Sequence, residues 1–297
     1  MATDTKQPAS SSPAPPPSRR QHWLHHLWRL GRWPVIFYLL VIVLMMLFEK
    51  SLVFVPTRYP GGDWQPQGLA IEDAWFDSAD GLRLHGWYVP HQDPRAVVLF
   101  CHGNAGNVTN RIGTLHALHR RAGASVLVFD YRGYGRSEGS PDEEGILADA
   151  RAARTWLAHR EGIAETDIVL LGRSLGGAVA VDLAAADGAR ALVLESTFSS
   201  APDMAAHHYW WLPVRPLMRT RLDSAAKIAD YHGPLLQSHG DADTIVPIRL
   251  GRRLFEAANE PKEFFPIPGG DHDDHQPWEY YEKLTEFLDS LKGSGPG

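Results

Sequence analysis

One serine lies where it could act as a nucleophile. Ser174 is the centre of the motif GRSLG (172–176), which follows an apolar run (167–172) and opens an alanine-rich helical run (175–187). A G-x-S-x-G motif between a strand and a helix is typical of a nucleophile elbow, whose glycines leave room that a Cβ would fill. The N–H groups at the start of the helix would also stabilise a developing oxyanion. The pattern predicts nucleophilic catalysis, with a structural turn serine as the alternative.

Carboxylates and histidines follow in the order that such a serine requires. The segment GDADTIVP (240–247) comes after one apolar run, and the segment GGDHDDH (269–275) comes after another. Both segments would therefore lie at the carboxyl ends of strands, on the sheet edge where Ser174 is expected. An acid and a base at that edge would complete a Ser-Asp-His triad.

The residues alone do not settle which acid and which histidine act. Asp241 and Asp243 are both candidates for the acid. His272 directly follows two glycines, whereas His275 lies nearer the next helix. Turn and N-cap roles are expected for the carboxylates of Asp241, Asp273 and Asp274, and a structural role is expected for Glu195, a further possible acid. The segment 271–275 resembles a row of metal ligands, but consecutive residues on one loop rarely close a coordination sphere, and no metal is expected.

The elements that would carry these residues alternate along the chain. Two runs, 71–78 and 82–90, flank the turn pair Asp80-Gly81 and predict a hairpin. Six further runs rich in Val, Leu and Phe predict strands buried on both faces, as in parallel sheets: 96–101, 125–130, 167–172, 191–195, 234–239 and 263–267. Amphipathic helical patterns lie between and after them, at 106–122, 143–160, 175–187, 247–258 and 278–291. This order predicts an α/β fold, a doubly wound sheet with right-handed crossovers.

Composition excludes several classes of protein. The 297 residues include 29 Lys and Arg against 35 Asp and Glu, a net charge of −6, whereas a general nucleic-acid binder carries a basic excess. A single cysteine excludes an intrachain disulfide framework and a zinc site built from several cysteines. That cysteine, Cys101, falls in a predicted buried strand and is expected to be an inert core thiol.

The N-terminal region predicts a membrane anchor. Residues 1–20 are rich in Ser, Pro and Ala and are expected to be disordered, whereas residues 34–48 contain no charged side chain. A tilted helix from about 33 to 54, with Glu49 and Lys50 reaching the headgroups, would span a bilayer. A cleaved signal peptide and a surface helix are the alternatives. The excess of basic residues before the segment places the N-terminus in the cytoplasm and the rest outside it.

Six motifs in order resemble the α/β-hydrolase superfamily, specifically its membrane-anchored Bem46-like and ABHD13/ABHD17-like serine hydrolases. They are HGNAGN (102–107), FDYRGYGRS (129–137), GRSLGG (172–177), ESTFSS (195–200), HGDADTIVP (239–247) and GGDHDD (269–274). The resemblance spans roughly residues 50–290 and includes the stretch EKSLVFVP (49–56). It implies a mostly parallel eight-stranded sheet with helices on both faces, a short cap and an N-terminal transmembrane helix.

The resemblance also implies roles for particular residues. The triad would be Ser174, Asp243 and His272, and the oxyanion hole would use the backbone N–H groups of Asn104 and Leu175. The expected activity is hydrolysis of carboxylic esters or thioesters of lipid-like acyl groups, without a metal or organic cofactor. A serine aminopeptidase and a catalytically silent membrane scaffold are the alternatives. The chain would divide into a tail (1–32), an anchor (33–55), a hydrolase domain (56–292) and a flexible C-terminus (293–297).

The segment between Glu195 and Gly233 occupies the place of a lid in other hydrolases. Its middle, HHYWWLPVRPLMRTR (207–221), is aromatic and basic and predicts a small cap over the acyl pocket. The alternative is ordinary helix packing with Trp210 and Trp211 in the core. The substrate itself, its acyl-chain length and the oligomeric state cannot be predicted from the sequence, because pocket shape depends on side chains from separate loops.

Overall fold

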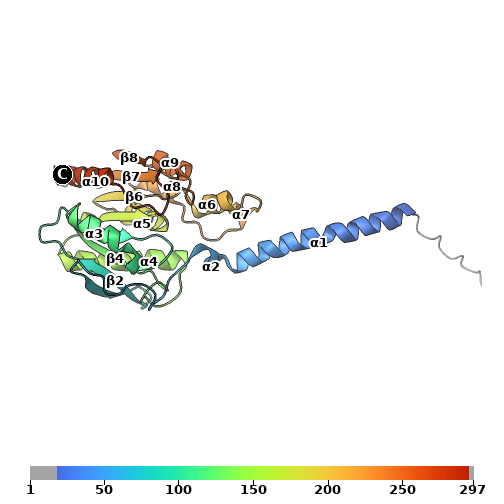
Figure 1. Ribbon diagram of the computed structural model, residues 1–297, viewed down its shortest axis with the longest axis horizontal. Helices are drawn as coiled ribbons and strands as arrows, with labels where there is room; N and C mark the ends of the chain where they lie inside the picture. The colour runs from blue at the N-terminus through green and yellow to red at the C-terminus, as the bar shows by residue number, and fades with distance from the viewer. Residues whose placement is uncertain (1–18, 294–297) are drawn as a thin grey trace, which may run out of the picture. The chain divides into compact units, whose positions relative to one another are not determined.

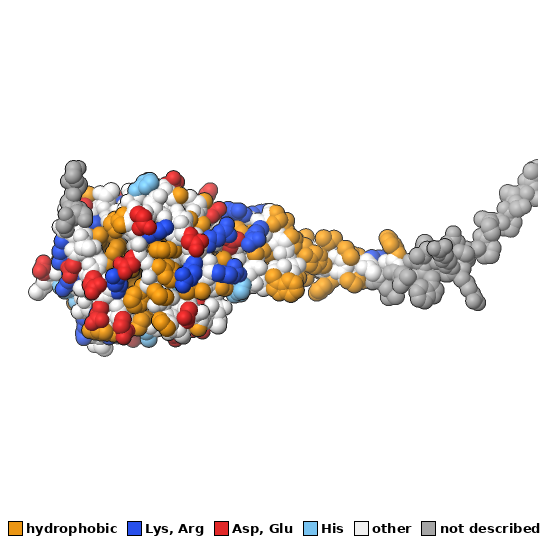
Figure 2. Space-filling view, turned by 90° about the horizontal axis from the view of Figure 1, so that it is seen from above, with side chains coloured by type: hydrophobic (Ala, Val, Ile, Leu, Met, Phe, Trp, Pro, Cys, Tyr) orange, Lys and Arg blue, Asp and Glu red, His pale blue; other side chains and the backbone are white. Residues whose placement is uncertain are grey.

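The computed structural model describes residues 19–293, which fall into two units divided between Leu47 and Phe48. The first unit is one helix, α1 (Arg19–Leu47). Figure 2 shows apolar side chains on its surface, and Phe37 and Leu47 are 67% and 73% exposed. None of the described helices combines the length and the apolarity that a bilayer crossing needs. Residues 1–18 and 294–297, where we expected disorder and flexibility, lie outside the described residues.

Two expectations about the N-terminal region are wrong. Residues 19 and 20, at the end of the segment expected to be disordered, are already helical, because no proline interrupts the chain between Arg19 and Pro34. The expected continuous helix to Phe54 is broken, since α1 ends at Leu47 and a separate short helix, α2 (Glu49–Val53), follows.

The charged pair after the break belongs to the second unit rather than to lipid headgroups. The Glu49 carboxylate accepts hydrogen bonds from the backbone N–H groups of Arg219 (3.0 Å) and Thr220 (2.7 Å). Lys50 pairs with Asp142 at 2.9 Å. These contacts draw Glu49 and Lys50 into the second unit, which therefore begins at Phe48 and not at residue 56.

The second unit is built on one eight-stranded sheet with the order β1-β2-β4-β3-β5-β6-β7-β8 (Figure 1). The first two strands form the predicted antiparallel hairpin, β2 pairs antiparallel with β4, and all remaining pairs are parallel. The strands are β1 (Glu72–Asp77), β2 (Arg83–Val89), β3 (Ala96–Cys101), β4 (Ala124–Phe129), β5 (Val169–Arg173), β6 (Ala191–Glu195), β7 (Leu235–Gly240) and β8 (Lys262–Ile267). Each predicted run forms a strand within two residues of its expected bounds.

Helices cover both faces of the sheet because its strands are apolar on both faces. In β3, Val97, Leu99 and Cys101 pack on one face, and Ala96, Val98 and Phe100 pack on the other. The first face is covered by α4 (Glu143–Glu161), α5 (Leu175–Asp187) and α9 (Ile248–Ala257), with α8 (Ser224–Lys227) and η3 (Ile228–Asp230). The second is covered by α3 (Ile112–Arg120) and α10 (Trp278–Ser290), with η1 (Val108–Arg111) and η4 (Leu291–Gly293). The predicted α/β architecture is confirmed.

The predicted cap segment forms two short helices between β6 and β7, α6 (Ala201–His208) and α7 (Val214–Leu217). Trp210 and Trp211 between them are 81% and 46% exposed, so the alternative that placed both indoles in the core is wrong. His208 Nε2 donates to the Ile245 carbonyl at 2.9 Å. The segment 207–221 therefore contacts the loop that carries Asp243. One more short helix, η2 (Glu165–Asp167), lies elsewhere in the domain and directly precedes β5.

Candidate active site

Ser174 lies in a strained turn between β5 and α5. Its φ of 53° is in the left-handed region that non-glycine residues rarely adopt, and its N–H donates to the Glu195 carbonyl at 2.9 Å. A Cβ on Gly172 would lie 2.3 Å from the Gly176 carbonyl oxygen, and one on Gly176 would lie 1.9 Å from the Cys101 carbonyl oxygen. The glycines of the motif are thus required by close backbone packing, which leaves the serine side chain at the carboxyl edge of the sheet.

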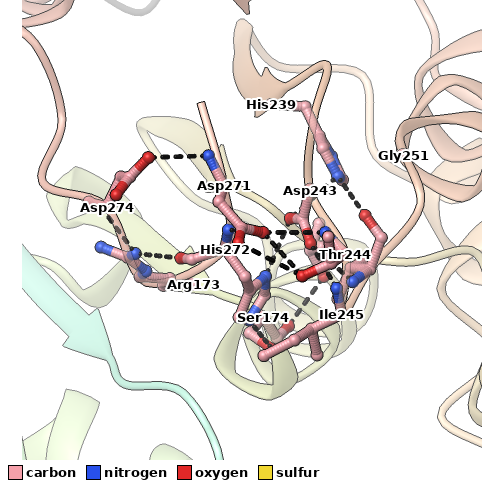
Figure 3. Close-up of polar contacts among 12 residues, drawn as sticks. Arg173, Ser174, His239, Asp243, Thr244, Ile245, Gly251, Asp271, His272 and Asp274 are labelled. Atoms are coloured by element: carbon pink, nitrogen blue, oxygen red, sulfur yellow. Dashed lines mark hydrogen bonds and ion pairs between the residues drawn. The ribbon is translucent and has the colours of Figure 1, made fainter. Parts of the chain in front are cut away.

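The side chains of His272 and Asp243 form a line with Ser174 (Figure 3). His272 Nε2 lies 3.1 Å from Ser174 Oγ, and His272 Nδ1 lies 2.8 Å from Asp243 Oδ2. Asp243 and His272 are both 8% exposed. This is the geometry in which a histidine can take a hydroxyl proton while a carboxylate fixes its tautomer.

Asp243 is kept ionised by the donors around it. Burial alone would raise the pKa of this carboxyl, but hydrogen bonds from His239 and His272 and from the backbone N–H of Val246 lower it well below its usual value. The N–H groups of Ile245 (3.0 Å) and Val246 (2.7 Å) both donate to Oδ1. Oδ2 is thereby left to face His272.

The other acidic side chains of the two loops hold the loops together. Asp241 Oδ1 accepts the Gly269 N–H at 2.6 Å, a contact between the two loops. Asp271 accepts the N–H groups of Thr244 (2.8 Å) and His272 (2.7 Å), and these hydrogen bonds lower the pKa of its carboxyl. Asp274 in turn accepts the Asp271 N–H at 2.8 Å. Of the alternatives left open by the residues, the structure brings Asp243 and His272 to Ser174.

The segment HGNAGN (102–107), which contains the predicted oxyanion donor Asn104 and is here called the oxyanion loop, lies beside the serine. A Cβ on Gly103 would lie 3.5 Å from Ser174 Cβ, so the backbone of this loop passes close to the nucleophile. Within the described residues, neither the Asn104 N–H nor the Leu175 N–H donates a hydrogen bond. Both donors are therefore available to a bound group. The neighbouring His102 is fully buried, and burial together with the nearby Arg111 lowers its pKa to about 3.

Arg173 is part of the site, and sequence reasoning missed it. Its guanidinium donates to the backbone carbonyls of His272 (2.5 Å) and Asp274 (3.1 Å), and so fixes the histidine loop against the elbow. Its place next to Ser174 in the motif was the one available signal. The partners lie 99 and 101 residues away, and no local pattern identifies them.

Two expectations of structural roles agree with the contacts. Glu195 is buried and accepts a hydrogen bond from the Tyr280 hydroxyl at 2.6 Å. Cys101 is fully buried, and burial raises the pKa of its thiol far above the usual range. In the part of the chain that the structure describes, no group of three or more potential metal-ligating side chains comes together.

Comparison with known sequences identifies relatives over most of the chain. A family model described as the alpha/beta hydrolase fold matches residues 96–241. The protein Rv2307c of Mycobacterium tuberculosis is 42% identical over 79% of this chain and 84% of its own length. The alpha/beta hydrolase domain-containing protein WAV2 of Arabidopsis thaliana is 33% identical over 78% of this chain and 84% of its own length. The membrane protein YNL320W of Saccharomyces cerevisiae is 30% identical over 75% of this chain and 81% of its own length.

Solved structures share the fold. The esterase Pf2001 of Pyrococcus furiosus superposes with a TM-score of 0.65, covering 80% of this chain and 97% of the esterase, at 21% sequence identity. Because the likeness in sequence is low, this match bears on the arrangement of the sheet and helices.

Proposed function

The chain belongs to the α/β-hydrolase family, and from this we propose that it is a serine hydrolase that cleaves carboxylic esters or thioesters through an acyl-enzyme on Ser174. The observation that carries the proposal is the hydrogen-bonded line from Ser174 Oγ through His272 to Asp243. Its position on a strained elbow adds support, because such strain persists where function requires it. The finer placement, among Bem46-like and ABHD13/ABHD17-like enzymes, rests on the six motifs described above.

In the proposed reaction His272 Nε2 takes the Ser174 hydroxyl proton as Oγ attacks the acyl carbonyl. Asp243 holds the Nδ1–H tautomer and stabilises the imidazolium that forms. The tetrahedral intermediate then expels the alcohol or thiol, which leaves with the proton from His272. Water, activated by the same histidine, attacks the acyl-enzyme and releases the acid.

The backbone N–H groups of Asn104 and Leu175 are proposed to bind the oxyanion of each tetrahedral intermediate. Neither N–H donates a hydrogen bond among the described residues, and Asn104 follows Gly103, whose backbone passes close to Ser174. Leu175 also opens helix α5, whose N-terminus carries partial positive charge. One such donor contributes about 3–4 kcal/mol to transition-state stabilisation in a comparable hydrolase.

Hydrolysis of p-nitrophenyl esters from acetate to palmitate by the full-length chain tests the proposal. We expect turnover, labelling of Ser174 by a fluorophosphonate, and a loss of about 10⁶-fold in kcat in Ser174→Ala. The acyl-chain length with the highest kcat/KM would indicate how long an acyl group the pocket holds. Cleavage of aminoacyl amides in place of esters would favour the aminopeptidase alternative, and absence of both turnover and labelling would favour the silent scaffold.

We also propose that residues 33–48 associate with a membrane, with the N-terminus in the cytoplasm and the hydrolase domain outside it. Support comes from the uncharged run 34–48, from its exposed apolar side chains, and from the name of the yeast relative as a membrane protein. We expect the full-length chain to sediment with membranes in alkaline carbonate and to be released by detergent. Release by carbonate alone would overturn this proposal without touching the catalytic one.

A further inference from the structure

The segment that joins helix α1 to the hydrolase domain lies along the oxyanion loop. We call residues 49–58 the strap. The Asn104 side-chain amide donates to the Val53 carbonyl at 2.6 Å and accepts the Val55 N–H at 3.1 Å. The Tyr134 hydroxyl donates to the same Asn104 oxygen at 2.8 Å. One side chain of the oxyanion loop is therefore bonded to the strap on both sides of Phe54.

The contact continues along both segments. The Thr57 N–H donates to the Gly106 carbonyl at 3.0 Å, and Pro56 and Gly106 form a parallel bridge. Asn107 Nδ2 donates to the Thr57 carbonyl at 3.1 Å. The strap thus acts like a short added strand along the loop, because it supplies hydrogen-bond partners that the loop does not find within itself.

The strap is fixed to the domain at points other than the oxyanion loop. The Phe54 side chain is 3% exposed and packs in the core that also contains Tyr134. Burial would raise the pKa of Glu49, but the N–H groups of Thr220 and Arg219 outweigh it and lower that pKa. The ionised carboxylate therefore holds the start of the strap to the segment after α7. A strap held in this way can impose a position on the loop.

We propose that the strap is a positioning element of the reaction: it holds Asn104 so that the backbone N–H of this residue points at the oxyanion. The inference rests on the proposed function. The side chain and the N–H belong to one residue, so losing the side-chain hydrogen bonds frees the peptide that carries the donor. Because the oxyanion charge develops only in the transition state, such a loss lowers kcat and leaves KM nearly unchanged.

The test replaces Asn104 with Ala in the full-length chain, which keeps the backbone N–H and removes the hydrogen bonds to the strap. We expect kcat to fall about 10–100-fold, less than the ~10²–10³-fold cost of losing an oxyanion donor, with KM within about twofold. Affinity for a trifluoromethyl ketone should fall in parallel with kcat/KM, because it mimics the tetrahedral intermediate.

Asn259→Ala is the matched control. The Asn259 amide also donates to two backbone carbonyls, those of Ala229 (2.7 Å) and Tyr231 (2.9 Å), but it does so outside the site. We expect both alanine variants to lower Tm and only Asn104→Ala to lower kcat. Equal kcat in the two variants, or a raised KM at unchanged kcat, would overturn the proposal.

A second pair of variants tests the strap from its own side. Val55→Pro removes the N–H that donates to Asn104, and Val55→Ala keeps it; the Val55 side chain is 53% exposed, so its loss alone costs little. We expect only the proline variant to reproduce the kcat loss, and full kcat in that variant would count against the strap. If the wild-type chain neither turns over esters nor reacts with a fluorophosphonate, the serine-hydrolase proposal fails and this one fails with it. An active wild type with unaffected variants overturns the strap alone.

Discussion

The elbow that carries Ser174 is held by packing, whereas the loops that carry Asp243 and His272 are held by polar contacts. At the elbow, Cβ atoms on Gly172 and Gly176 would collide with backbone oxygens. In the loops, Asp271 bridges Thr244 and His272, and Arg173 holds the carbonyl of His272. The nucleophile therefore depends on shape and its partners depend on hydrogen bonds, so different substitutions should disturb them.

Among substitutions in the two polar loops, Asp243→Asn should have the largest effect on kcat. The N–H groups of Ile245 and Val246 both donate to Oδ1, so the asparagine would keep its oxygen there and turn its NH₂ group toward His272. His272 Nδ1 would then accept, and Nε2 would carry the proton and lose its role as a base. We expect kcat to fall about 10⁴-fold with little change in KM.

Asp241→Asn is the matched control for this change, because among residues 19–293 its carboxylate accepts the Gly269 N–H and has no hydrogen bond with His272. Its asparagine oxygen can still accept, and kcat should stay within a few-fold of wild type. Steady-state kinetics on one soluble ester would compare the two. Equal losses in both variants would contradict the assignment of the acid to Asp243.

A smaller effect, on folding, should come from Gly176→Ala. The new Cβ would meet the carbonyl oxygens of Cys101 and His102, which are backbone atoms and cannot move aside cheaply. We expect the free energy of unfolding to drop by about 3 kcal/mol, at the upper end of typical overpacking costs. In Gly113→Ala, on helix α3, the new Cβ meets a side-chain atom of His275 at 3.6 Å, an ordinary contact. We expect this variant to raise the free energy of unfolding by about 0.5–1 kcal/mol.

Urea unfolding followed by far-ultraviolet circular dichroism measures both variants. A Gly176→Ala protein as stable as wild type would mean that the elbow relaxes, and that packing does not hold the nucleophile. Asp243→Asn brings no new atom against the backbone, so we expect it to lower kcat strongly and the free energy of unfolding only a little. That contrast separates the two regions directly.

The same contrast explains what the sequence could predict. Strands, helices and the elbow follow from local patterns, because apolar runs and the glycines of GRSLGG act on near neighbours. The preference for Asp243 over Asp241 needed a family resemblance, since both lie in the same loop between β7 and α9. The contacts of Arg173 with the histidine loop and of Asn104 with the strap join residues 49 or more positions apart, and polar contacts at such distances leave no periodic pattern. The end of α1 at Leu47 was missed for the same reason, because the partners of Glu49 lie at 219 and 220.

The smallest effect concerns pH. The pKa of His102 is lowered to about 3, below its unfolded value of about 6.5, so the unfolded chain binds one more proton between these values. Stability from this group is complete above about pH 6.5 and falls as pH drops, by about 2 kcal/mol between pH 7 and pH 5. The loop carboxylates Asp243 and Asp271 behave differently: their lowered pKa values keep their contribution until pH falls below about 4.

Urea unfolding at pH 7 and pH 5 of wild type, His102→Asn and Asp271→Asn tests this difference. His102→Asn should lose about 2 kcal/mol less than wild type over that interval, whatever its stability at pH 7, because asparagine does not titrate. Asp271→Asn should follow wild type, since its carboxylate is ionised at both pH values. If His102→Asn also follows wild type, the buried histidine does not set the acid response, and the packed region would be no more sensitive to mild acid than the polar loops.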